Sequence, residues 1–298
     1  MNLIKELMDK IRALNQLQFL FLDKNMPLAE SNDIKTFTAY LNYCVDKGVS
    51  IAFLAESYDL IVKDMFKEQV YFQRHKRYRH SNYSDVANSV YQNKEYMTKY
   101  MYGLALTAFL WPNHRAIHHF FLKEIVKNRT GQYLEIGPGH GLYFMQSMIN
   151  GRFSSYKGVD ISPTSVEMTK DILQSKHFGD FQDYTIECSD FLTSSVSGKY
   201  DFIVMSEVLE HVENPDIFLE KIKILLNKNG AAFITTCINS PAIDHIFLYD
   251  TVEMLVTQVE KAGLKVVTKL IVPYANLTLE ESMNKLLPVN VAMSLELK

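Results

Sequence analysis

Residues 133–142, Y-L-E-I-G-P-G-H-G-L, are the most informative segment of this chain. It begins as a short apolar strand and continues into three glycines at alternate positions, Gly137, Gly139 and Gly141. Glycines at a turn from a buried strand into a helix let the backbone approach a ligand closely, because no Cβ stands in the way. The spacing differs from the dinucleotide pattern G-x-G-x-x-G, and Pro138 lacks the N–H that a pyrophosphate would use. The loop therefore favours a nucleoside without a pyrophosphate.

Two further strands also end in polar residues. Y-K-G-V-D, residues 156–160, ends in Asp160 about twenty residues beyond the glycines, where nucleoside-binding α/β folds hold the ribose diol. Y-T-I-E-C, residues 184–188, is followed by Asp190 and Phe191, a carboxylate that can accept from an exocyclic amine and a ring that can cover a purine. We expect these ends to meet at one edge of a parallel sheet, and to frame a ribose and an adenine there.

A fourth strand, residues 200–205, runs into S-E-V-L-E-H-V-E-N-P. With this segment the chain resembles the class I S-adenosylmethionine-dependent methyltransferases over about residues 132–298, because all four motifs occur in the family's order and at its spacing. A nicotinamide-dependent dehydrogenase would share the first two motifs, but it explains neither the E-V-L-E-H segment nor the two strands expected near residues 265–270 and 289–297.

The resemblance implies an α/β fold, a Rossmann-like seven-stranded sheet with helices on both faces, whose last two strands form an antiparallel pair. It implies S-adenosyl-L-methionine as the cofactor. The residues that match the family's cofactor motifs are Glu135, Gly137, Gly139, Gly141, Asp160, Ile161, Asp190, Phe191, Ser206 and Glu207.

The first part of the chain has a different character. Leu3, Leu7, Ile11 and Leu14 fall at helical spacing, and convincing alternating strands are scarce before residue 130. We predict an all-α N-terminal cap and substrate-binding domain over residues 1–128, followed by a catalytic domain over residues 129–298. The family resemblance implies that such a cap encloses the acceptor.

Two dense segments of the cap have open interpretations. Q-R-H-K-R-Y-R-H, residues 73–80, is either a solvated, salt-bridged helix face or a site for a phosphate or a carrier-protein phosphopantetheine arm. His114 and His118 share a helical face and serve either in packing or in the acceptor pocket.

The residues that could activate the acceptor follow the fourth strand. Glu207, Glu210 and His211 stand at i, i+3 and i+4, so one helical turn would bring them to the same side. Three interpretations remain: loop hydrogen bonds only, a general base formed by His211 or His245, or a divalent metal site formed by Glu207, Glu210, His211 and His245. Two carboxylates and two imidazoles suit Mg²⁺, Mn²⁺ or Fe²⁺. The string also resembles metal sites in small-RNA 2′-O-methyltransferases and, in part, in ubiquinone-pathway O-methyltransferases.

Composition narrows the class of protein. The chain has 298 residues, 47% hydrophobic and 22% charged, with a net charge of −3, which gives no electrostatic case for a nucleic-acid partner. The three cysteines have neither metal-like nor disulfide-like spacing, no apolar run reaches the length of a membrane span, and the chain start lacks a signal-peptide pattern. These features predict a cytoplasmic protein without a membrane partner.

The expected function is methyl transfer from S-adenosyl-L-methionine to a small-molecule acceptor, most simply a hydroxyl, in the biosynthesis of a metabolite or natural product. The alternatives are N-methylation and an acceptor that carries phosphate or is tethered to a carrier protein. A cofactor-binding protein without catalysis is disfavoured by the furnished loop after the fourth strand. A homodimer through the apolar N-terminal helices is compatible with the sequence.

Overall fold

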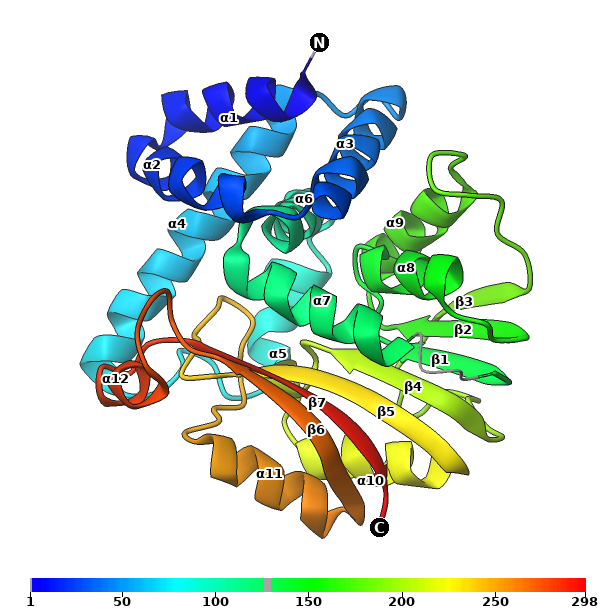
Figure 1. Cartoon of the computed structure of the whole chain (residues 1–298). Coiled ribbons are helices and arrows are strands. Elements are labelled where there is room, and N and C mark those ends of the chain that lie inside the picture. The colour runs from blue at the N-terminus through cyan, green and yellow to red at the C-terminus, as the bar shows by residue number, and fades with distance from the viewer. Residues whose placement is uncertain (1, 126–129) are drawn as a thin grey trace.

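A computed structural model describes residues 2–125 and 130–298, so the predicted domain boundary between residues 128 and 129 lies outside the described residues. Helices make up the N-terminal region (Figure 1): α1 Leu3–Leu14, α2 Gln16–Asn25, η1 Met26–Leu28, α3 Ser31–Asp46, α4 Ile51–His75, α5 Tyr83–Val86, η2 Ala87–Tyr91 and α6 Lys94–Leu110. Short polar side chains start the two longest helices: Ser50 accepts from the N–H of Phe53 at α4, and Asn93 from that of Tyr96 at α6. The predicted all-α region before the first strand is confirmed.

A seven-stranded sheet follows, with the order β3-β2-β1-β4-β5-β7-β6. Its strands are β1 Gln132–Ile136, β2 Ser155–Asp160, β3 Tyr184–Cys188, β4 Tyr200–Ser206, β5 Leu226–Ile238, β6 Leu264–Val272 and β7 Val289–Leu297. The pairings from β3 through β5 are parallel, whereas β7 lies antiparallel between β5 and β6. The predicted fold class is therefore confirmed, including the antiparallel pair at the end.

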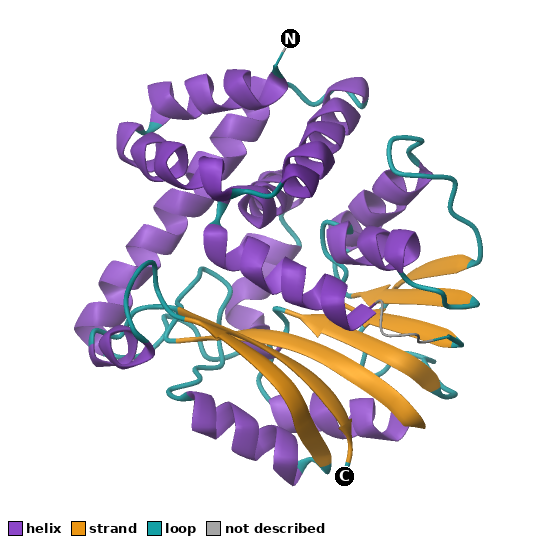
Figure 2. Ribbon diagram, in the orientation of Figure 1, coloured by secondary structure: helices purple, strands orange, loops and turns teal. Residues whose placement is uncertain are grey.

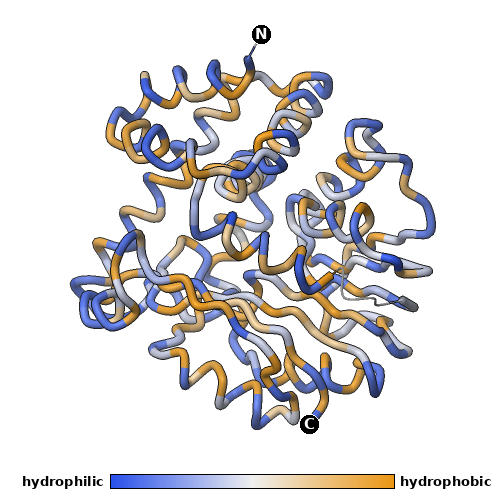
Figure 3. Tube along the Cα trace, viewed as in Figure 1, coloured by the Kyte–Doolittle hydropathy of each residue, from blue (hydrophilic) through white to orange (hydrophobic). Residues whose placement is uncertain are grey.

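Helices cover both faces of the sheet (Figure 2). One face carries α7 Pro112–Ile125, α8 Leu142–Asn150 and α9 Pro163–Gln174, and the other carries α10 Pro215–Leu225 and α11 Val252–Lys261. The short α12 Leu279–Asn284 precedes β7. Apolar residues concentrate along the strands between these layers (Figure 3).

The cap and one face of the sheet share a core. Buried cap residues such as Tyr58 and Leu106 belong to the same apolar cluster as Phe121 of α7 and Phe233 of β5. The rings of Phe121 and Phe233 lie 5.1 Å apart, which fixes α7 on the sheet although it precedes residue 128. Over the described residues, no helix is long and apolar enough to cross a membrane.

β1 lies between β2 and β4, which are reached by connections on opposite faces. In open α/β sheets, ligands bind outside the carboxyl ends of the strands at such a reversal of strand order. The cap approaches this same edge: α5 lies beside it in Figure 1, and η2 and α6 each supply a tyrosine that is hydrogen-bonded to Asp244 in the segment after β5. The fold therefore places any ligand of this sheet edge beneath the cap.

Candidate active site

The glycine loop joins β1 to α8 with three left-handed backbone conformations: φ is +69° at Gly137, +57° at Gly139 and +80° at Gly141. A Cβ on Gly141 would lie 2.9 Å from the Cα of Thr169, and one on Gly139 would lie 3.0 Å from the Cε of Met101 in α6. Residues with a side chain would be strained here and would push against α9 or the cap. The loop therefore lies close to both the sheet edge and the cap.

Asp160 at the end of β2 is bound to this loop. Its Oδ2 accepts from the N–H of Gly139 at 3.0 Å, and its Oδ1 accepts from the N–H of Ser162 at 2.8 Å. Burial raises the pKa of the carboxyl to about 6, although both hydrogen bonds lower it. Asp160 and the glycine loop consequently form one unit at the predicted ribose position.

Glu135 lies in the neighbouring strand β1 and is 2% exposed. Its Oε2 accepts a hydrogen bond from the hydroxyl of Tyr133, whose oxygen in turn accepts from Ser147 at 2.7 Å. Burial raises the pKa of Glu135 to about 8. This acid is therefore a protonated, hydrogen-bonded core group at neutral pH in the protein without ligand.

The segment after β3 is built around a turn. The Oδ1 of Asp190 accepts from the N–H of Leu192 at 2.9 Å. Phe191 is only 4% exposed and packs 5.7 Å from the ring of Phe218, so its visible contribution is to anchor this turn in the core. Ile161, after β2, is 46% exposed.

The ends of β4 and β5 hold two residues in strained backbone conformations, Glu207 with φ +53° and Asn239 with φ +50°. The Glu207 N–H donates to the carbonyl of Thr235 at 3.0 Å, and the Thr235 hydroxyl donates to Oε1 of Glu207 at 2.7 Å. Ser206 and Thr235 share a further hydroxyl–hydroxyl bond of 2.8 Å. These bonds fix the direction in which the chain leaves β4.

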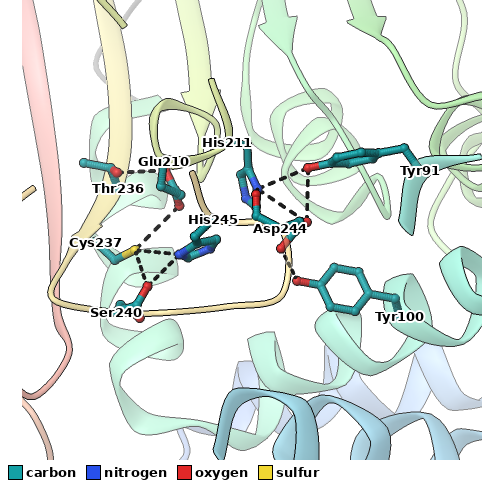
Figure 4. A network of polar contacts seen from close by, with 9 residues as sticks. All are labelled: Tyr91, Tyr100, Glu210, His211, Thr236, Cys237, Ser240, Asp244 and His245. Carbon is teal, nitrogen blue, oxygen red and sulfur yellow. Dashed lines mark hydrogen bonds and ion pairs between the residues drawn. The ribbon is translucent and has the colours of Figure 1, made fainter. Parts of the chain in front are cut away.

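A buried polar cluster follows directly (Figure 4). Glu210, in the turn η3 Leu209–His211, is fully buried and accepts from the hydroxyl of Thr236 at 2.7 Å. The Nδ1 of His245 lies 2.6 Å from the carbonyl of Ser240, so Nδ1 carries the proton and Nε2 keeps its lone pair. The rings of His211 and His245 meet edge to face, with centroids 4.7 Å apart.

The predicted metal ligands are brought together in part. One ligand atom each from Glu210, His211 and His245 lie within 4.8 Å of one another, whereas Glu207 groups with Glu210 and Cys237. Burial raises the pKa of Glu210 well above its usual range, and the neighbouring Glu207 raises it further, while burial lowers the pKa of His245 to about 3. These three side chains therefore fit a cation. His211 and His245 can each offer a ring nitrogen, and a bound ion would favour the ionised form of Glu210.

The cap supplies residues that sequence reasoning missed. Tyr91 in η2 and Tyr100 in α6 both donate to the carboxylate of Asp244, at 3.1 and 2.9 Å, and the ring of Tyr78 lies 5.8 Å from that of His245. Burial opposes ionisation of Asp244, but the adjacent histidines and tyrosine hydroxyls lower its pKa below the ordinary value. The string D-H at residues 244–245 was a usable signal, while nothing in sequence spacing joins it to the tyrosines.

The two cap segments with open interpretations differ in the burial and the contacts of their side chains. His114 is hydrogen-bonded to the hydroxyl of Thr107 in α6 at 3.0 Å, and the ring of His118 packs against that of Tyr143 in α8, with centroids 5.7 Å apart. Both side chains are partly buried, and desolvation lowers the pKa of His118 to about 4. In the basic segment, Arg79 donates to both carboxylate oxygens of Glu68 at 3.0 Å. Arg74 and Arg77 are exposed.

Comparison with known proteins agrees with this architecture. Residues 112–269 match the methyltransferase domain family. The ubiquinone biosynthesis O-methyltransferase of Glaesserella parasuis is 32% identical over 107 residues, which cover 35% of this chain and 44% of that protein. Its counterpart in a Chelativorans species is 34% identical over 103 residues, 35% of this chain and 39% of that protein. The chain therefore spans less than half the length of these curated relatives.

Solved structures agree in fold. An S-adenosylmethionine-dependent methyltransferase from Clostridium acetobutylicum has a TM-score of 0.50 at 12% identity, covering 65% of this chain and 97% of that one. The fold and its loop-bearing edge define a Rossmann-like nucleoside-binding domain. The family match over more than half of the sequence then identifies it: this chain belongs to the methyltransferase domain family, the S-adenosylmethionine-dependent methyltransferases.

Proposed function

We propose that this protein transfers the methyl group of S-adenosyl-L-methionine to a hydroxyl of a small molecule held between the sheet edge and the cap. The observation that supports this proposal best is the cluster of Glu210, His211 and His245 in the segments that follow β4 and β5, where Glu210 and His245 are buried and His211 is partly buried. The curated relatives named as O-methyltransferases support oxygen as the acceptor atom.

The cofactor half of the site consists of the glycine loop and Asp160. Asp160 already orders the loop through the Gly139 N–H, and its remaining lone pairs are available to a ribose diol. Asp190 is the proposed acceptor for the adenine amine. Glu135, Ile161, Ser206 and Glu207 complete the proposed cofactor set.

Methyl transfer from a sulfonium is an in-line displacement, so positioning of the oxygen, carbon and sulfur is the main requirement. A hydroxyl also has to lose its proton, whereas a neutral amine needs little such help. The Nε2 of His211 is the proposed proton acceptor. His245 is a much weaker base, because burial lowers its pKa to about 3, and its proposed part is to bind the acceptor or an ion. A base at the position of His211 favours O-methylation over N-methylation.

The same residues fit a divalent cation such as Mg²⁺, Mn²⁺ or Fe²⁺, with Glu210, His211 and His245 as the ligands that lie together and Glu207 beside them. When bound, such an ion lowers the pKa of a coordinated hydroxyl. Glu210 is held by Thr236 and His245 by the Ser240 carbonyl, so each would present a fixed atom to the ion or the acceptor.

The test is calorimetry with S-adenosyl-L-methionine, followed by formation of S-adenosylhomocysteine with catechol, phenol, an aliphatic alcohol and a primary amine. We expect Asp160→Ala to weaken cofactor binding about 10- to 100-fold, since it removes charge-assisted hydrogen bonds worth about 1.5–3 kcal/mol. The exposed Asp180→Ala is the matched control and should bind normally. Binding that is unchanged in Asp160→Ala, or methylation of the amine alone, would overturn the proposal.

A further inference from the structure

Asp244 lies between β5 and α11, where the cap contacts the catalytic domain. Its side chain is 2% exposed, and its two oxygens accept from two cap tyrosines, Oδ1 from Tyr100 and Oδ2 from Tyr91 (Figure 4). Tyr100 and Tyr91 are 144 and 153 residues away along the chain. A carboxylate buried this far gains stability only where donors satisfy it, and here both direct hydroxyl donors come from the cap.

The same carboxylate faces His211. The Nδ1 of His211 lies 3.1 Å from the Asp244 carbonyl oxygen, 3.4 Å from Oδ2 and 3.1 Å from the Tyr91 hydroxyl oxygen. Because Tyr91 gives its only hydroxyl proton to Asp244, its oxygen can only accept from His211. All three neighbours of Nδ1 are therefore acceptors, which places a proton on Nδ1, so the neutral ring of His211 has its lone pair on Nε2.

We propose that Asp244 is the positioning residue of the active site, and that the cap completes it: Tyr91 and Tyr100 fix the Asp244 carboxylate, and this carboxylate together with the Asp244 carbonyl fixes the ring and tautomer of His211. This inference rests on the proposed function, in which His211 Nε2 acts on the acceptor. It holds equally whether Nε2 takes a proton or binds a cation, because either role needs that lone pair in a fixed direction.

If Asp244 only anchored the two domains to each other, its substitution would have different effects. Loss of an anchor lowers stability and cofactor affinity together with turnover. Loss of positioning lowers kcat while S-adenosyl-L-methionine still binds, since the glycine loop and Asp160 lie outside the Asp244 network.

The experiment uses the full chain with S-adenosyl-L-methionine and catechol. For Asp244→Asn we expect kcat to fall about 10- to 100-fold with cofactor Kd changed by less than about twofold, the range seen for outer-shell partners. Tyr100→Phe and Tyr91→Phe leave the carboxylate in place and should fold normally, with smaller losses of kcat. Tyr96→Phe, one turn from Tyr100 on α6, removes a comparable hydroxyl bond to Asp64 and is the control with unchanged kcat.

A double-mutant cycle tests whether Tyr100 and Asp244 act together, and ¹⁵N-histidine spectra report the tautomer of His211. Tyr100→Phe should add little to the loss already present in Asp244→Asn, because both act through one network. In ¹⁵N-histidine spectra, with the His211 signals assigned by their loss in His211→Gln, wild type should show Nδ1 protonated, and Asp244→Asn should show a mixture of tautomers.

Two results would overturn the inference: kcat unchanged in Asp244→Asn, or His211 protonated on Nε2 in wild type. Failure of the proposed function is separately visible, because wild type would then form no S-adenosylhomocysteine with any hydroxyl acceptor while the spectra still report the tautomer of His211.

Discussion

Substitution of Gly141 by alanine tests how closely the cofactor loop is packed. Gly141 precedes α8 with φ +80°, and an added Cβ would lie 2.8 Å from Ile172 Cγ2 and 2.9 Å from the Cα of Thr169. The Thr169 atom is helix backbone and cannot rotate away, so α8 and α9 have to separate. Gly48 is the matched control: its φ is +86°, but an added Cβ would meet nothing within 4 Å.

The two positions separate strain from overpacking. A left-handed alanine costs about 1 kcal/mol at either position. Overpacking adds about 1–3 kcal/mol at Gly141 alone, for a total of about 2–4 kcal/mol. Gly141→Ala should also weaken cofactor binding, because the loop moves with α8, whereas Gly48→Ala should not.

Urea unfolding of both variants measures this difference. The single tryptophan, Trp111, lies between α6 and α7 and reports by fluorescence, while far-ultraviolet circular dichroism tests whether the transition is two-state. If Gly141→Ala lowers the unfolding free energy no more than Gly48→Ala does, the described packing of the loop on α9 is wrong.

Three further outcomes are expected. Mn²⁺ should raise the melting temperature of wild type by several degrees, reversed by EDTA, but not that of Glu210→Gln; equal shifts would exclude the cation site. Glu135 has a folded pKa of about 8 against an ordinary 4.5, so its stabilising effect is complete below pH 4.5 and is lost as the pH rises through 8. Urea unfolding should thus show a fall in stability between about pH 5 and 8 that is smaller in Glu135→Gln; identical profiles would contradict the buried, protonated state. Replacing the exposed Arg74 and Arg77 by glutamine should leave the acceptor KM unchanged, whereas a clear rise would favour a phosphorylated or carrier-tethered acceptor.

Much of the fold could be predicted from the sequence, because the motifs that define it are short and local. β1 leads into the glycine loop before α8, β2 ends in Asp160 shortly before α9, and β6 and β7 were expected close to their observed bounds. The cap was predictable as helical but not in its packing. α7 lies before residue 128 in sequence and yet packs on β5 through Phe121, because apolar helix faces do not specify which partner they meet.

The candidate site could likewise be predicted from the sequence only in part. Glu210 and His211, which are adjacent in the sequence, gather with His245, whereas Glu207 forms a second group with Glu210 and Cys237. Tyr91 and Tyr100 could not be predicted, because contacts between residues more than a hundred positions apart depend on how the two domains dock.

The placement of β7 sets an order of events during synthesis. β5 and β6 do not pair with each other, and each bonds only to β7 on the side where they would meet. Until residues 289–297 leave the ribosome, the apolar β5 presents an open edge that can pair with another nascent chain. We expect translation stalled before residue 289 to yield a chaperone-dependent, aggregation-prone intermediate, even with the glycine loop and the cap already made.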